Sequence, residues 1–216
     1  MNRSSIHELL NDAKDTSRTR KEINQTLLRQ DISNTIKSFS NFILGNRNII
    51  SQYDVENLEF EIRLGQKMQG TFNPSLKYEM RQKLIERLKM DNWNMMNNNT
   101  IDYFYDTKEG SRRISVDKET KEILEDIYKG NFSIHDDFES PELKHTLRCN
   151  IKSEEKKEIN DNTIPTGYNF IREKQRMTFT KEELWWIDLT TVISQHSNQT
   201  QSLPNYEVSF FVFFHI

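Results

Sequence analysis

Residues 58–64 read LEFEIRL, in which Glu59, Glu61 and Arg63 alternate with apolar residues. If this stretch is a β-strand, the two carboxylates and the guanidinium share one face and the apolar side chains share the other. Carboxylate oxygens are the ligands that hard divalent ions such as Mg²⁺ prefer. The polar face therefore either contacts bulk water or lines a site.

Three later segments also place their polar side chains on one alternating set. Outward-facing charges are the common arrangement in antiparallel sheets. Inward-facing charges are costly unless they pair or bind a charged ligand. A divalent metal ion on the carboxylates, with a polyphosphate across the cations, would be a suitable ligand, because Arg matches phosphate oxygens bidentately. The alternation leaves both arrangements open. The three sets are Arg113, Ser115 and Asp117; Arg172, Lys174, Arg176 and Thr178; and Trp186, Asp188 and Thr190.

The elements that carry these residues follow from periodicity and stop signals. A first helix is predicted from Asp31, as N-cap, to Gly45. A second lies within residues 74–92, capped by Ser75 and with apolar residues four apart, and a polar loop follows over residues 92–99. Short strands come next, which predicts an α+β chain whose antiparallel sheet of about eight strands closes into a barrel, with the helices outside. The strands after the first are expected at 100–106, 111–117, 121–128, 132–137, 143–152, 169–179, 183–192 and 206–214.

Length and composition fit one domain and exclude several classes of protein. The chain has 216 residues, of which 34 % are hydrophobic and 29 % charged, and its net charge is −3, so any polyanion must meet a local cluster of cations. The single Cys149 excludes an internal disulfide and a Cys-rich zinc site. With no membrane-length apolar run and no signal peptide, we expect a soluble intracellular protein. Residues 1–30 are expected to form a polar, loosely held arm.

The order of the polar strands resembles the metal-dependent RNA 5′-triphosphatases, the β-subunit type of mRNA capping enzyme, which belong to the triphosphate tunnel metalloenzymes. The resemblance covers roughly residues 32–207. LEFEIRLG matches an ExExK-type strand, RRISVD an RVTYD-like strand and REKQRMTF an RxKxRxSY pattern. WIDLTTV matches a strand with a single Asp, and YEV matches the start of an ExExE strand. Each match is weak alone, whereas five in the family's order are fairly specific.

The resemblance implies an eight-stranded triphosphate tunnel over residues 31–207 that removes the γ-phosphate of triphosphate-ended RNA, the first step of mRNA capping. It further implies a nuclear location and a guanylyltransferase on a separate chain as partner; a homodimer stays open. By the same resemblance, the metal, Mg²⁺ or Mn²⁺, is held by Glu59, Glu61 and Glu207. Arg63 and Asp188 orient a metal ligand or the attacking water. The phosphates are bound by Arg113, Lys129, Arg172, Lys174 and Arg176.

The sequence departs from the family pattern at two places. In residues 143–152, Lys152 falls where the family has a further tunnel Glu, so either this register is wrong or a carboxylate is lost. After Glu207 the expected acidic positions are replaced by the apolar tail 208–216. Glu-Val-Ser can be encoded by GAG-GTA-AGT, which contains a splice-donor consensus, so the hypothesis is that this tail is read-through of a retained intron and the last strand is incomplete.

Two alternative functions remain at this point. One is a barrel of the same fold that hydrolyses inorganic triphosphate or a small organic triphosphate. The other is a truncated, inactive barrel that binds polyphosphate or a capping partner.

Overall fold

The computed structural model describes residues 30, 33–108, 110–140, 145–182, 185–196 and 201–212. The strands are β1 (Leu58–Met68), β2 (Thr71–Asn73), β3 (Asn94–Thr107), β4 (Gly110–Asp117), β5 (Ile123–Ser140), β6 (His145–Lys156), β7 (Phe170–Lys181), β8 (Trp185–His196) and β9 (Asn205–Val212). A helix over residues 33–50, the 3₁₀ turn η1 (Val55–Asn57) and the helix α2 (Tyr78–Met90) complete the described elements.

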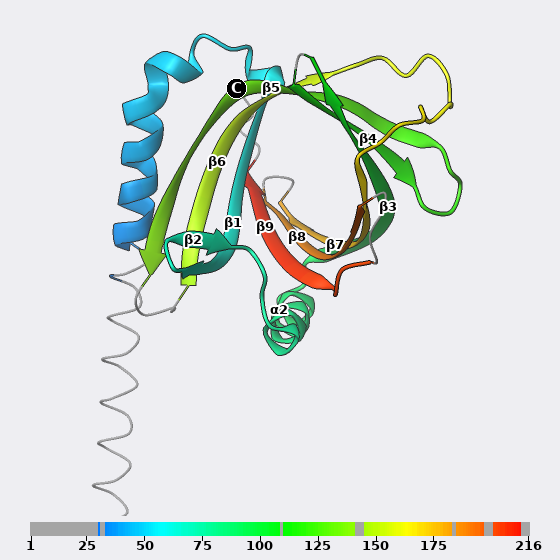
Figure 1. Ribbon diagram of the computed structural model, residues 1–216. Helices are drawn as coiled ribbons and strands as arrows, with labels where there is room; N and C mark the ends of the chain where they lie inside the picture. The colour runs from blue at the N-terminus through cyan, green and yellow to red at the C-terminus, as the bar shows by residue number, and fades with distance from the viewer. Residues whose placement is uncertain are drawn as a thin grey trace, which may run out of the picture.

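The sheet closes on itself as an antiparallel barrel. Its strand order is β1-β6-β5-β4-β3-β7-β8-β9, and β9 pairs back onto β1 through Ile62↔Phe210, Arg63↔Ser209 and Leu64↔Val208. The short β2 lies outside this ring and forms a hairpin with the end of β1. Figure 1 shows the ring along its axis, with both helices outside it. The predicted closed barrel with outside helices is confirmed.

The two helices cover the apolar outer faces of the strands. Leu88 and Ile85 of α2 pack in one cluster with Phe179, Leu189 and Val208, from β7, β8 and β9. The helix over residues 33–50 packs on the opposite side of the ring through Phe39, Phe42, Ile43 and Ile50, against a cluster built on Phe138, Cys149 and Ile151. Since these clusters lie outside the ring, the polar alternating sets are left to face its interior.

Both predicted helix boundaries need correction. The first helix does not stop at Gly45 but continues to residue 50, because Ile50 packs in the outer core and this contact offsets the cost of a helical glycine, about 1 kcal/mol. Its predicted N-cap, Asp31, lies outside the described residues. Ser75 does not cap α2, which begins at Tyr78 without a side-chain cap. The preceding segment is held extended by a hydrogen bond from the Leu76 amide to the Tyr206 carbonyl, 2.8 Å.

Two strand predictions also need correction. Part of the polar segment 92–99 is not a loop, because β3 begins at Asn94 and pairs with β7 from there on, so ladder hydrogen bonds override the Asn-rich composition. The strands expected at 121–128 and 132–137 are one strand, β5. Its pairing with β6 shifts register between Lys129 and Ser133, so the expected turn is an irregularity within a continuous strand.

Candidate active site inside the barrel

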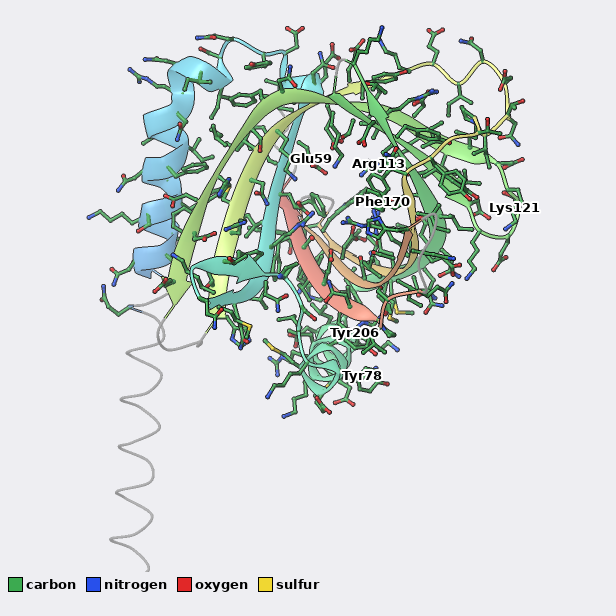
Figure 2. The ribbon with its side chains drawn as sticks, in the orientation of Figure 1. Glu59, Tyr78, Arg113, Lys121, Phe170 and Tyr206 are labelled. Carbon is green, nitrogen blue, oxygen red and sulfur yellow. The ribbon has the colours of Figure 1, made fainter. Side chains whose placement is uncertain are left out.

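Polar side chains from the alternating sets meet inside the barrel, as Figure 2 shows for Glu59 and Arg113. Asp102, Glu61 and Asp188 are only 1 %, 5 % and 6 % exposed, although each is ionisable. Of the two arrangements that the sequence leaves open, the structure has the inward one. The buried charges are compensated by one another, as the ion pairs below show, with a few exceptions that matter for function.

Glu61 is the most firmly held carboxylate. Its Oε2 lies 2.8 Å from Arg63 Nε, and its Oε1 accepts a 2.8 Å hydrogen bond from Ser209 Oγ of β9. Burial by itself would raise the pKa of Glu61, but the charge and hydrogen bonds of Arg63, together with the Ser209 hydroxyl, hold it below its usual range. Arg63 therefore positions an ionised Glu61.

Glu59 has no such partner among the described residues. Burial raises its pKa, and the neighbouring carboxylates of Glu154 and Glu61 raise it further, against the opposing charges of Lys152 and Lys129. A half-buried carboxylate without an ion pair or hydrogen bond, beside two more carboxylates, is unfavourable in the metal-free protein. The same oxygens are suitable donors for a hard divalent cation.

Glu154 is a tunnel carboxylate that the sequence reasoning missed. In the structure Lys152 lies beside Glu59 as its cross-strand neighbour on β6. Glu154 follows two residues later on the same face, with its Oε2 3.9 Å from Arg113 and its Oε1 3.7 Å from Lys129. The predicted strand ended at residue 152, two residues short of this glutamate. Extending the alternation beyond Lys152 would have revealed it, so a tunnel carboxylate is present on this strand.

The cations lie mainly on β4 and β7 and pair with carboxylates that the sequence reasoning did not single out. Lys174 Nζ lies 2.5 Å from Asp102 Oδ2 of β3, and Arg113 lies 3.2 Å from Glu125 of β5. Burial lowers the pKa of Lys174 and Arg113 lowers it further, against the opposing charge of Asp102. Burial and Arg113 likewise lower the pKa of Lys129. This crowding of cations favours an anionic ligand.

Asp188 is held from two sides on β8. Thr178 Oγ1 donates a 2.7 Å hydrogen bond to its Oδ1, and Arg176 Nε lies 3.3 Å from its Oδ2. Burial raises the pKa of Asp188, and Glu61 contributes in the same direction, while Arg176 and Thr178 oppose them. A carboxylate held in position in this way is oriented to accept a proton from a water molecule.

Arg172 and Glu207 lie apart from these pairs. Arg172 contacts the rings of Phe104 and Phe170, and no carboxylate in the described segments forms an ion pair with it. Glu207 accepts a 3.0 Å hydrogen bond from Asn205 and acts electrostatically on Arg63. Within the described ranges, no three His, Cys, Asp or Glu residues lie close enough together to hold a metal ion. The carboxylates near Glu59 would therefore supply only part of a coordination shell, leaving positions for water and phosphate oxygens.

The interior thus combines carboxylates suited to a divalent ion, cations suited to phosphate oxygens and one carboxylate suited to a water molecule. The model of the family "mRNA capping enzyme, beta chain" matches residues 35–210. This chain belongs to that family. The family comprises metal-dependent RNA triphosphatases. The carboxylates and cations of the interior are suited to that reaction.

Solved structures of capping triphosphatases share the fold. The S. pombe Pct1 RNA triphosphatase superposes with a TM-score of 0.65 at 19 % identity, over 82 % of this chain and 78 % of that chain. The Mimivirus capping enzyme triphosphatase gives a TM-score of 0.56 at 18 % identity, over 82 % of this chain and 90 % of that chain. The S. pombe protein has also been solved in complex with the Spt5 CTD, at 17 % identity and a TM-score of 0.64. No curated protein sequence matches the chain.

Proposed function

We propose that this capping-family chain removes the γ-phosphate from triphosphate-ended RNA inside the barrel, with Mg²⁺ or Mn²⁺ as cofactor. The observation that supports this most directly is Glu59, a half-buried carboxylate with no ion pair or hydrogen bond among the described residues, beside the carboxylates of Glu61 and Glu154. The bound ion would neutralise charge on the phosphates. Glu59 and Glu61 would hold it with Glu154 close by, and Arg63 would fix the orientation of Glu61.

The other residues act on the phosphates and on water in this proposal. Arg113, Lys129, Lys174 and Arg176 bind phosphate oxygens, and in a site with little water each such contact stabilises developing charge more than it would in solvent. Asp188, oriented by the Thr178 hydroxyl, takes a proton from the attacking water. Glu207 acts through Arg63, because its negative charge stabilises the charged guanidinium of that residue.

The experiment is γ-phosphate release from triphosphate-ended RNA, with Mg²⁺, Mn²⁺ or a chelator, and with inorganic tripolyphosphate as the competing substrate. We expect metal-dependent release from RNA and loss of at least about 100-fold in Glu59→Ala, since even groups that only support metal ligands contribute 10–100-fold. Full activity of that variant would overturn the proposed site. Release from tripolyphosphate alone would favour the small-substrate alternative, and binding without release would favour an inactive barrel.

The partners and location are proposed from the family. A capping triphosphatase must pass its product to a guanylyltransferase, which we propose is a separate chain, and we propose the nucleus as the place of action. Co-purification with a guanylyltransferase and the mass of the protein in solution would test partner and homodimer together. In the described part of the chain, no helix is long and apolar enough to cross a membrane.

The interpretation of the two ends of the chain also stays a proposal. The arm over residues 1–30 lies almost wholly outside the described residues, as does the end of the tail 208–216. Residues 208–212 belong to β9, which closes the barrel, so the tunnel does not end at residue 207. We propose that the segment 208–216 is nevertheless encoded by a retained intron. A transcript spliced directly after the Glu207 codon would support this, whereas a colinear transcript would contradict it.

A further inference from the structure

A column of aromatic rings lies at one rim of the barrel. Phe104 and Phe170 stack with ring centroids 4.4 Å apart and planes 4° apart, and the His196 ring lies 5.3 Å from Phe170 with its plane tilted by 36°. Phe170 is the first residue of β7 and its cross-strand partner His196 is the last residue of β8, so the column is at the end of both strands. Figure 2 shows Phe170 on the interior side of the ribbon.

Exposure increases along this column from the interior to the rim. Phe104 is 9 % exposed, Phe170 is half-buried and His196 is exposed. The outermost ring is therefore accessible to solvent. Rings whose only role is packing are usually covered on both faces, whereas a column with an open end can accept one more planar group.

Arg172 connects this column to the cations of the interior. Its guanidinium carbon lies 5.3 Å from the Phe104 ring and 5.6 Å from the Phe170 ring. Its buried Nε has no hydrogen-bond partner among the described residues. Along β7 the same face then carries Lys174 and Arg176, the second of which lies about 13 Å further in by strand geometry.

We propose that this rim holds the first nucleoside of the substrate, with its base stacked at the outer end of the Phe104–Phe170–His196 column and its nearest phosphate on Arg172. The inference rests on the proposed function. It adds a structural reason for that site to prefer RNA over inorganic triphosphate. Aromatic platforms bind bases of any identity because every base has a π-face. A guanidinium next to such a platform is placed for the phosphate that follows a base.

The test compares a ligand that carries nucleosides with one that carries none. A fluorescent oligoribonucleotide with a 5′-triphosphate is bound to the protein, and tripolyphosphate is used as the competitor. We expect Phe170→Leu and His196→Ala each to weaken oligonucleotide binding by about fivefold or more, by the usual contribution of base stacking, and to leave tripolyphosphate competition unchanged. Tyr168→Leu is the matched control, because Tyr168 contacts Tyr103 edge to face in a separate aromatic pair.

The outcomes separate this inference from the proposed function. If Phe170→Leu and His196→Ala weaken the binding of both ligands equally, or weaken the binding of neither, the proposed nucleoside site is wrong. If the wild-type protein hydrolyses triphosphate-ended RNA and the variants keep its preference over tripolyphosphate, the proposed function stands and only this inference fails. If the wild-type protein binds neither ligand, both fail. His196 is exposed, so its variant tests the proposal even where Phe170→Leu does not fold.

Discussion

At the scale of single residues, the most informative side chain is Glu59, whose pKa is raised by burial and by the carboxylates of Glu154 and Glu61. The folded protein then keeps the proton to higher pH than the unfolded chain, for which the reference value is 4.5. The ionised form therefore destabilises the folded state, and this penalty grows as the pH rises from the unfolded pKa through the folded one.

Glu59→Gln removes that penalty because the amide resembles the protonated acid. In the metal-free protein we expect this variant to have the same melting temperature as the wild type near pH 4, and a higher one at pH 7 to 8. Thermal melts in chelator across this range measure it. The exposed Glu155→Gln on the same sheet is the control. A wild-type advantage that increases with pH would contradict the account.

The single cysteine gives a second prediction at this scale. Cys149 is 1 % exposed, and burial raises the pKa of its thiol from 9.0 to about 12. The native protein therefore holds far less thiolate at pH 8 than a free thiol does. We expect a thiol reagent at pH 8 to leave the native protein unlabelled for hours and to label it within minutes in denaturant. Rapid labelling of the native protein would show that this outer core opens readily.

At the scale of elements, β9 differs from the pattern of its family at Ser209. The sequence resemblance expects a carboxylate at this position, whereas the Ser209 hydroxyl donates to Glu61 and is 8 % exposed. Ser209→Glu would place another buried carboxylate beside Glu61. We expect it to lower the melting temperature in chelator and to increase the stabilisation by Mn²⁺ above that of the wild type. Equal shifts by Mn²⁺ in both proteins would place the ion away from β9.

The helix α2 gives a prediction about stability without chemistry. Leu88 is 8 % exposed and packs in the outer cluster with Phe179 and Leu189. Leu88→Ala should lower the free energy of unfolding by about 2–5 kcal/mol, the usual cost of this truncation in a core. Activity per folded molecule should be unchanged at low temperature, because the cluster is on the outer side of the strands. Chemical denaturation and a phosphate-release assay measure the two effects, and a loss of turnover in the folded variant would contradict this division.

The sequence predicted the elements unequally, for physical reasons. Strands with strict alternation, such as residues 58–64 and 169–179, were placed correctly because one face of each is apolar and packs outside. The start of β3 was missed because its Asn-rich residues have no strand preference of their own and depend on pairing with β7. Asp102, Glu125 and Glu154 were missed as site residues since no motif includes them, although each lies on the polar face of its strand.

At the scale of the whole molecule, the polar faces of the strands are inside and the apolar faces are outside, under the helices. The alternation could not decide between this arrangement and its reverse, because both satisfy the same pattern. The decision depends on long-range closure of β1 onto β9 and on the helices that cover the outer faces. Barrel closure and helix packing are properties of the folded chain. In the sequence, only the order of the motifs indicated the inward arrangement.

Two neighbouring arginines on β4 test this arrangement directly. Arg112 pairs with Asp126 through two hydrogen bonds of 2.8 and 2.6 Å and contacts the rings of Tyr105 and Tyr128 on the outer side. Arg113 contacts Glu125 and Glu154 on the inner side. The two residues have the same chemistry and differ in which side of the barrel they face.

The decisive measurement is therefore the rate of γ-phosphate release from triphosphate-ended RNA by Arg112→Ala and Arg113→Ala, each at a temperature where both variants are folded. Arg113→Ala should lose at least about 100-fold, as expected for removing a donor to developing charge. Arg112→Ala should melt at a lower temperature and keep its turnover. A folded Arg113→Ala protein with wild-type turnover, or loss of turnover confined to Arg112→Ala, would contradict the inward-facing site.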